Sequence, residues 1–482
     1  MKSKELLFEL IHSLTKSEKR YFKIFATMHG DNNNYVELFD AIHLQKKYDE
    51  EALKKQFQDR DFTRQFSVAK NYLLNLILKS LRNFHHKAKV SVEINDLLSE
   101  VELLYWKGLY KLAYKRLSQA KKLANKYDLT IYLIQINYWK GKLRGYVDSA
   151  KDTADIVPEI RSLTNDIRDL MELDMMVNEL MVYTTITLRG NPDITEKVTK
   201  ILNHPLLSEE YEKHTKHFNI LAKIYTIKGI CSFLINDYDT EYLYKQKLIE
   251  LNENNPHQIK EDPIRYTKAL NNMLLYYYFR NQGESVKELL EKLNNIDLKF
   301  PHAKHIVEKN KFSFNLMYYL ATENMEKITA ITNDAEEWYP QLKDKMTRQD
   351  KMILEYNMVC IYFLQNNFKK ALRWGNSVMS YFDKATKSFR HDLAVSNLIT
   401  LFLIYIELGY YDLADRSLAQ AEEIAKYNKY DKVEKQTIAE MKKLLNPNNI
   451  ENVKLYLQDL LDKHSDKLIN IDKDIFNIYL KK

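Results

Sequence analysis

The sequence has 482 residues and a formal net charge of +7, with 45% hydrophobic and 29% charged residues. This apolar content is sufficient to bury a core, so the composition excludes a disordered chain. Only 9 glycines and 8 prolines are present, and the tight turns of a β-rich or doubly wound fold need many more. The composition therefore favours helices.

The first 90 residues carry most of the excess positive charge. They contain 17 Lys or Arg against 11 Asp or Glu, whereas the remainder of the chain is nearly neutral. Attraction for a polyanion is therefore expected to be concentrated in this part of the chain. We predict that residues 1–90 form a basic N-terminal helical module.

A helix is predicted to begin at Thr15, whose hydroxyl can accept from the backbone amide of Glu18 while the Glu18 carboxylate reaches back. One face of this helix carries a basic stripe, formed by Lys16, Lys19, Arg20 and Lys23. This stripe lies opposite the apolar face of the same helix.

Another helix is predicted from about Phe62, with apolar residues at helical spacing. These apolar residues are Phe62, Phe66, Ala69, Leu73, Ile77 and Phe84. A polar stripe on the opposite face consists of Arg64, Asn71, Asn75, Lys79, Arg82 and His86. Two interpretations are open. The two stripes contact phosphates and base edges in a helix-turn-helix-like module, or they are solvated faces of the first part of a helical array.

From about Asp96 the apolar spacing predicts pairs of helices, and one pattern recurs where the two helices of a pair would meet. A residue that tolerates a left-handed backbone is followed by an aromatic residue two positions later and an alanine five positions later. The three copies are Gly108, Tyr110 and Ala113; Asn366, Phe368 and Ala371; and Gly409, Tyr411 and Ala414. Two copies continue with Leu117 and Ala120 or with Leu418 and Ala421, whereas the third has Gly375 and Val378.

This arrangement resembles the tetratricopeptide repeat, whose helix-turn-helix unit has a turn Gly or Asn, then an aromatic residue and alanines at these spacings. Weaker turns are expected at Gly190, Asn236, Gly283 and Asn324, which gives a period of about 43 residues against the family's usual 34. Four prolines follow a similar spacing and are each expected to end a helix; they are Pro205, Pro256, Pro301 and Pro340.

The resemblance implies an all-α fold, a right-handed superhelix of stacked antiparallel helix pairs that follows the N-terminal module. We expect about seven or eight pairs over residues 91–445 and capping helices over residues 446–482. Each pair would bury its apolar face against the next pair.

The sequence contains no recognisable reaction chemistry. The glycines form neither a dinucleotide fingerprint nor a phosphate loop, and no nucleophile motif occurs. Two histidine pairs with helical spacing lack the glutamate of a His-Glu-x-x-His motif. Cys231 and Cys360 do not form a close pair, so neither a disulfide framework nor a structural zinc site is indicated. We expect no enzyme activity, no cofactor and no metal.

The location is predicted from two further features. The longest apolar stretch without a charge, Leu393–Ile406, is shorter than the ~20 residues that cross a bilayer. Glu5 and Glu9 interrupt the apolar segment that a secretion signal requires. We therefore expect a cytoplasmic protein without a membrane segment.

These observations predict an interaction protein. In the tetratricopeptide family the first helices line a concave groove, so the resemblance implies that a protein or peptide partner binds there. By the same resemblance, Tyr277, Arg280 and Asn281 would face this groove. The alternative is a regulator whose residues 1–90 bind nucleic acid through the two polar stripes while the repeats sense a partner.

Overall fold

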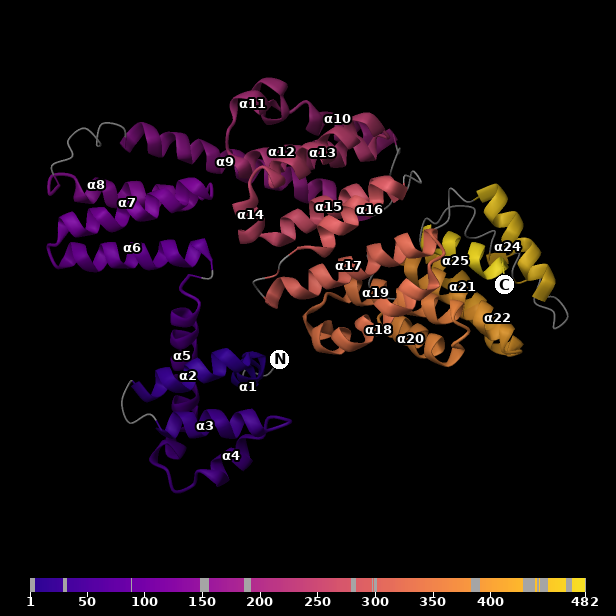
Figure 1. Cartoon of the computed structure of the whole chain (residues 1–482), viewed down its shortest axis with the longest axis horizontal. Helices are drawn as coiled ribbons and strands as arrows, with labels where there is room; N and C mark the ends of the chain where they lie inside the picture. Colours follow the sequence, from indigo (N-terminus) through magenta and orange to yellow (C-terminus); the bar gives the residue numbers. More distant parts are fainter. Residues whose placement is uncertain are drawn as a thin grey trace. The chain divides into compact units, whose positions relative to one another are not determined.

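The computed structural model is helical, and no strand occurs among the residues that it describes (Figure 1). The structure describes residues 5–28, 33–87, 89–147, 156–185, 192–278, 283–296, 298, 301–382, 391–427, 438, 439, 442, 450–464 and 470–481. The predicted all-α class is confirmed for these residues. The chain divides into two compact units, Met1–Met171 and Glu172–Lys482, with the boundary inside one long helix.

The first unit begins with helices that share one core. They are α1 (Leu6–Ser13), α2 (Lys16–Met28), α3 (Asn33–Leu44), α4 (Glu50–Gln56) and α5 (Phe66–Phe84), with a 3-10 helix at Asp61–Gln65. Phe22, Phe39 and Leu73 are fully buried in this core. Removing such large apolar side chains from water is the main stabilising contribution to folding.

The predicted start of α2 is confirmed by its hydrogen bonds. The amide of Thr15 donates to Glu18 Oε2 at 2.6 Å, and the amide of Glu18 donates to Thr15 Oγ1 at 3.2 Å. His85, directly after α5, places Nε2 2.7 Å from Glu18 Oε1. The capping pair therefore also connects the start of α2 to the end of α5.

The helix predicted from Phe62 begins later than expected, and this corrects the second polar stripe. Arg64 lies in the 3-10 helix, and Gln65 breaks the helical path with φ −125° and ψ 52° before α5 begins. The Thr63 hydroxyl donates to the carbonyl of Phe57 at 2.5 Å, which holds this tighter turn. Arg64 therefore does not share a helix face with the polar residues of α5. Phe84, in the last turn of α5, is 37% exposed.

Three further helices of the first unit lie side by side in an antiparallel stack (Figure 1). They are α6 (Val90–Trp106), α7 (Tyr110–Lys126) and α8 (Thr130–Leu143), and they are followed by α9 (Ile156–Thr185), which crosses the unit boundary. Ala113 and Ala120 of α7 are fully buried, as their small side chains allow a close approach of α6. Their cluster is separate from the core of α1–α5.

The second unit consists of helices that mainly contact their neighbours in the sequence (Figure 1). Its shorter helices are α10 (Pro192–Leu202), η3 (Pro205–Leu207), α11 (Glu209–His214), α14 (Pro256–Glu261) and η4 (Lys343–Lys345). Its helix pairs are α12 (Phe218–Leu234) with α13 (Tyr238–Glu253), α15 (Pro263–Tyr278) with α16 (Gly283–Asn294), α17 (Pro301–Ala321) with α18 (Met325–Leu342), α19 (Arg348–Leu364) with α20 (Phe368–Ser380), α21 (His391–Glu407) with α22 (Tyr411–Tyr427), and α24 (Ile450–His464) with α25 (Asn470–Leu480).

One turn geometry joins the two helices of several pairs. The predicted turn residues Gly108, Asn366 and Gly409 have left-handed φ values of +71°, +56° and +73°, and Asn236 has +62°. At each turn a backbone amide bonds to the carbonyl five residues earlier, as in the bond from Leu109 to Leu104 at 2.9 Å. These are Schellman helix ends, which satisfy carbonyls that the helix itself leaves unpaired.

Some predicted junctions differ from the structure. The left-handed residue between α17 and α18 is Glu323, with φ +53°, whereas Asn324 caps α18 by accepting from the amide of Lys327. Pro340 lies inside α18, close to its end, and does not separate two helices. Gly190 falls outside the described residues, and Gly283 is the first residue of α16.

Candidate functional site

The last helix of the chain lies across the first helices of earlier pairs. Helix α25 contacts both α17 and α19, although more than one hundred residues separate it from them in the sequence. Ile475, Phe476 and Tyr479 lie on one face of α25 and are buried in the same cluster as these helices. We refer to the covered surface of α17, α19 and α21 as the α25 seat.

Tyr479 is the most connected residue of this contact. Its ring centroid lies 5.0 Å from that of Phe363 on α19, and its hydroxyl donates to the carboxylate of Glu407 on α21. Burial raises the pKa of Tyr479, and the hydrogen bond to Glu407 acts in the same direction. Lys481, next to α25, forms an ion pair with Glu323 at the end of α17. Three first helices therefore contribute to the seat.

Buried polar contacts connect these three helices to one another. Tyr356 of α19 lies 3.5 Å from the Thr400 hydroxyl of α21, measured between their oxygen atoms. On the other side of α19, Asn357 Nδ2 donates to Ser313 Oγ of α17 at 3.3 Å. Polar pairs in a low-dielectric interior are directional, so they favour one register between neighbouring helices. The seat is thus built on helices that are fixed relative to one another.

A polar groove of about 470 Å³ runs between α17 and α18. Its lining residues are Asn294, Lys304, Glu308, Lys311, Phe312, Asn315, Ile331, Asp334, Glu337, Trp338 and Gln341. Asn315 Nδ2 donates to Asn294 Oδ1 at 3.0 Å, and the rings of Phe312 and Trp338 meet edge to face at 6.4 Å. The lining of this groove mixes lysine, glutamate and aspartate side chains with these two rings.

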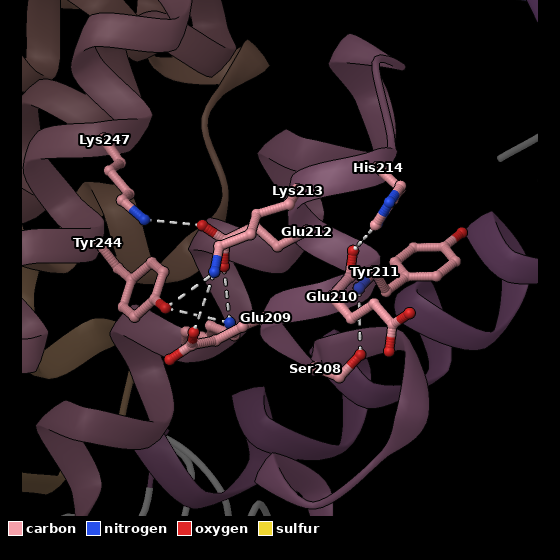
Figure 2. Close-up of polar contacts among 10 residues, drawn as sticks. Ser208, Glu209, Glu210, Tyr211, Glu212, Lys213, His214, Tyr244 and Lys247 are labelled. Atoms are coloured by element: carbon pink, nitrogen blue, oxygen red, sulfur yellow. Dashed lines mark hydrogen bonds and ion pairs between the residues drawn. The ribbon is translucent and has the colours of Figure 1, made fainter.

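A buried charge network joins three other helices of the second unit. Figure 2 shows Glu212 of α11 with Tyr244 and Lys247 of α13. The two carboxylate oxygens of Glu212 each lie 2.7 Å from a lysine Nζ, one from Lys247 and the other from Lys228 of α12. The Tyr244 hydroxyl accepts from Lys228 Nζ at 3.0 Å. The network ties α11 to α12 and α13.

The predicted groove residues are only partly described. Tyr277 of α15 is half-buried, and its ring lies 6.2 Å from that of Tyr242 and 5.7 Å from that of Tyr276. Burial, with a further contribution from Tyr242, raises the pKa of Tyr277 to about 12. Tyr277 packs against a different hydrophobic cluster from the one that holds α25. Arg280 and Asn281 lie outside the described residues.

The basic stripe of α2 is partly directed towards α3. Lys23 Nζ lies 2.7 Å from Asp40 Oδ1, and Lys19 Nζ lies 3.3 Å from His43 Nε2. Lys16 and Arg20 are exposed. On α5 the polar stripe is exposed at Asn71, Asn75, Lys79 and Arg82, and His86, which follows the helix, is exposed as well. Nucleic-acid binding by residues 1–90 stays a prediction.

Across the part of the chain that the structure describes, no group of three or more His, Cys, Asp or Glu side chains is arranged to hold a metal ion. None of the helices within the described ranges combines the length and the apolar character needed to span a bilayer. Cys231 and Cys360 are buried, and the two do not form a disulfide.

The sequence predicts capping helices over residues 446–482 but does not predict the seat. The apolar positions of Ile475, Phe476 and Tyr479 were visible as a helix face, whereas their distant partners were not. Comparison with known proteins gives no matching family model, no matching curated protein and no matching solved structure.

Proposed function

We propose that this chain is a non-enzymatic, tetratricopeptide-like interaction protein of the cytoplasm that binds an amphipathic helix of a protein partner. The observation that carries the proposal is the α25 seat. A surface that holds an apolar helix from the chain's own terminus has the shape and chemistry to hold a similar helix from another protein.

The repeat-like turns support this proposal. The four junctions at Gly108, Asn236, Asn366 and Gly409 share a left-handed backbone and Schellman bonding, and small residues are buried beyond three of them, at Ala113, Ala371 and Ala414. At the fourth junction the corresponding residue is Glu241, which pairs with Lys245 at 2.5 Å. Repeated surfaces without a reaction motif are suited to recognition.

The proposed partner helix would follow the pattern of α25. Its apolar residues would occupy positions i, i+1 and i+4, as Ile475, Phe476 and Tyr479 do, with a cation at position i+6 to meet Glu323. Helix α25 would then compete with the partner for the seat. Because α25 belongs to the same chain, its effective concentration at the seat is about millimolar. A partner must therefore bind tightly enough to displace α25.

The test uses a fluorescent peptide with the sequence of residues 470–482 and the full-length protein. We expect weak binding to the unmodified chain and at least tenfold tighter binding to a chain with Phe476→Ala and Tyr479→Ala, because its own helix competes less well. A peptide with the same two substitutions should not bind. Fluorescence anisotropy measures all three affinities.

Leu455→Ala is the matched control, because Leu455 lies on α24 and is 68% exposed. This substitution should leave peptide affinity unchanged. Equal peptide affinity for the unmodified chain and the double variant would contradict the proposal, as would binding of the substituted peptide.

A further inference from the structure

A cluster of aromatic rings lies at one end of the stack formed by α6, α7 and α8. Helix α6 ends, α7 begins and α8 ends at this side of the antiparallel stack (Figure 1). We refer to the cluster as the aromatic end, and it consists of Tyr105, Tyr110, Tyr138, Trp139 and Tyr146. Trp106 follows Tyr105 in the sequence at the end of α6 and makes no ring contact with the cluster among the described residues. It belongs to the first unit and takes no part in the α25 seat.

Ring contacts organise the aromatic end. The Tyr110 and Tyr146 rings are stacked, with centroids 3.9 Å apart and 23° between their planes. Tyr105 contacts Tyr110 at 5.6 Å and Trp139 at 5.7 Å. Trp139 in turn contacts Tyr138 at 6.0 Å. The rings therefore form a continuous chain and are positioned before any ligand binds.

Several of these rings are open to solvent. Trp106 is 71% exposed, Tyr138 is 57% exposed and Tyr146 is 51% exposed. Large exposed rings gathered in one place are uncommon on a protein surface that has no partner, because each leaves apolar area in water. The arrangement indicates a surface that becomes covered.

One cation lies over these rings, and three others lie close to ring residues in the sequence. Lys142 Nζ lies 4.8 Å from the Tyr138 ring centroid and 5.0 Å from that of Trp139. Neighbouring exposed cations are Lys107, Lys111 and Arg144, and within residues 89–147 none of the three forms an ion pair in the structure. Elsewhere in the molecule many lysines lie beside a carboxylate, as Lys228 and Lys121 do. A hydrogen bond with Tyr138 and the nearby charge of Glu102 raise the pKa of Lys142, so the positive charge available to an anion is mainly that of Lys107, Lys111 and Arg144.

The helix dipole explains the positions of only some of these cations. Lys107, Lys142 and Arg144 lie at helix carboxyl ends, where cations are favourable. Lys111 lies in the first turn of α7, where a cation is unfavourable. The exposed rings have no such explanation. The combination is suited to a partner that presents flat apolar groups and negative charge together.

We propose that the aromatic end binds single-stranded nucleic acid. Bases would stack on Trp106, Tyr138 and Tyr146, while Lys107, Lys142 and Arg144 contact phosphates. Single-stranded nucleic acid presents planar bases and phosphates at neighbouring positions, which an acidic peptide does not. This inference concerns a different surface from the α25 seat and from the stripes of residues 1–90.

The test is fluorescence anisotropy of the full-length protein with labelled 20-nucleotide strands of oligo-dT and oligo-rU. We expect binding in 50 mM salt, and weaker binding by about 20-fold in 200 mM salt if three phosphates are contacted. Trp106→Ala, Tyr138→Ala and Tyr146→Ala should each weaken binding at least fivefold. Lys142→Gln should weaken binding and also reduce the salt dependence. Binding of either strand supports the proposal, and the difference between them identifies DNA or RNA as the preferred form.

Matched controls separate this surface from the others. Trp338→Ala removes the same side chain from the groove of α17 and α18, and Lys79→Gln with Arg82→Gln removes the charge of α5; both should leave affinity unchanged. Circular dichroism melting shows that each variant is folded. The proposal is overturned by absence of binding in 50 mM salt, or by ring variants that bind normally. It is also overturned if duplex binds more tightly than single strands, or if polyaspartate of equal charge competes as well as the oligonucleotide.

Discussion

Glu212 is a buried carboxylate that two lysine side chains share. Its side chain is 11% exposed, and that of Lys228 is 8% exposed. Burial by itself raises the pKa of Glu212, but hydrogen bonds from Lys228 and Lys247 more than offset this effect, so the pKa lies below its ordinary value. The carboxylate is therefore ionised at neutral pH and compensates two cations.

Replacing Glu212 with Gln should strongly destabilise the second unit. The substitution leaves the Lys228 ammonium group buried without its counterion, and loss of one partner from a buried pair costs about 3–5 kcal/mol. Urea unfolding followed by circular dichroism measures the change. Glu209→Gln is the control in the same short helix, because Glu209 and its partner Lys213 are largely exposed. Its effect should be below about 1 kcal/mol. Equal effects of the two variants would contradict the assigned role of Glu212.

Glu50 should give the first unit a dependence on acid pH. The hydrogen bond from Lys70 lowers the pKa of Glu50 to about 2, although burial opposes the shift. Because the folded-state pKa is lowered, the stabilisation is fully present above the unfolded value near 4.5 and is lost as the pH falls towards 2. Between pH 4.5 and pH 2, the unfolding free energy of Glu50→Gln should fall by less than that of the unmodified protein. The difference between the two should be on the order of 2 kcal/mol.

Urea titrations of the first unit's transition at several pH values measure this effect. Glu51→Gln is the control, because the Glu51 side chain is 84% exposed. That variant should keep the acid dependence of the unmodified protein. If Glu50→Gln keeps it as well, Lys70 does not stabilise the ionised carboxylate.

Helices α20 and α21 approach each other closely at Gly375. A Cβ atom built on Gly375 would lie 2.7 Å from Leu401 Cδ2 and 3.3 Å from Asn397 Oδ1. Asn397 Nδ2 also donates to the carbonyl of Gly375 at 3.1 Å, which fixes the distance between the helices. Gly375→Ala should therefore destabilise the protein by about 1–3 kcal/mol through overpacking, despite the better helix propensity of alanine.

Gly141 provides the opposite case within helix α8. No atom lies within 4 Å of a Cβ built there, and its backbone is helical. Gly141→Ala should stabilise the first unit by about 0.5–1 kcal/mol, because alanine loses less backbone entropy. Thermal unfolding of the two variants should show shifts of opposite sign. Shifts in the same direction would mean that propensity, and not helix spacing, determines the effect at Gly375.

Sequence patterns predict the helix ends and turns whose geometry depends on residues that are close together in the chain. The turns at Gly108, Asn366 and Gly409 follow from residues that tolerate a left-handed backbone, and the capping pair at Thr15 follows from two side chains three residues apart. The turn at Glu323 was displaced by one residue, because Asn324 is used as a helix cap. A helix cap and a left-handed turn favour similar residue types, so sequence alone does not separate them.

Contacts that are distant in the sequence could not be predicted in this way. The apolar face of α25 predicts burial, but nothing local identifies Phe363 or Glu407 as the partners of Tyr479. The aromatic end was missed for a similar reason, because its rings come from three helices and aromatic residues usually pack in cores. Only the structure shows that several of these rings are exposed, and this exposure distinguishes a surface cluster from core packing.

Across the whole molecule, the buried apolar residues form separate clusters. One belongs to α1–α5, and another contains most of the helices from α17 to α25. Helices in the second of these clusters mainly contact their neighbours, so stabilising free energy is distributed locally there, whereas in the first cluster α2 packs mainly on α5. Helix α25 is an exception, because it couples the end of the second unit to α17 and α19.

Core variants in the two clusters should therefore weaken different parts of the chain. Ile77 of α5 and Ile361 of α19 are both fully buried, and replacing either with alanine should cost about 2–5 kcal/mol. Hydrogen exchange with mass spectrometry should show that Ile77→Ala lowers protection in α1–α5 and leaves α17–α21 unchanged, while Ile361→Ala does the reverse. Ile361→Ala should also lower protection in α25, because its anchor Tyr479 packs on α19 through Phe363. If both variants instead lost protection throughout the chain, the two clusters would unfold together as one cooperative unit.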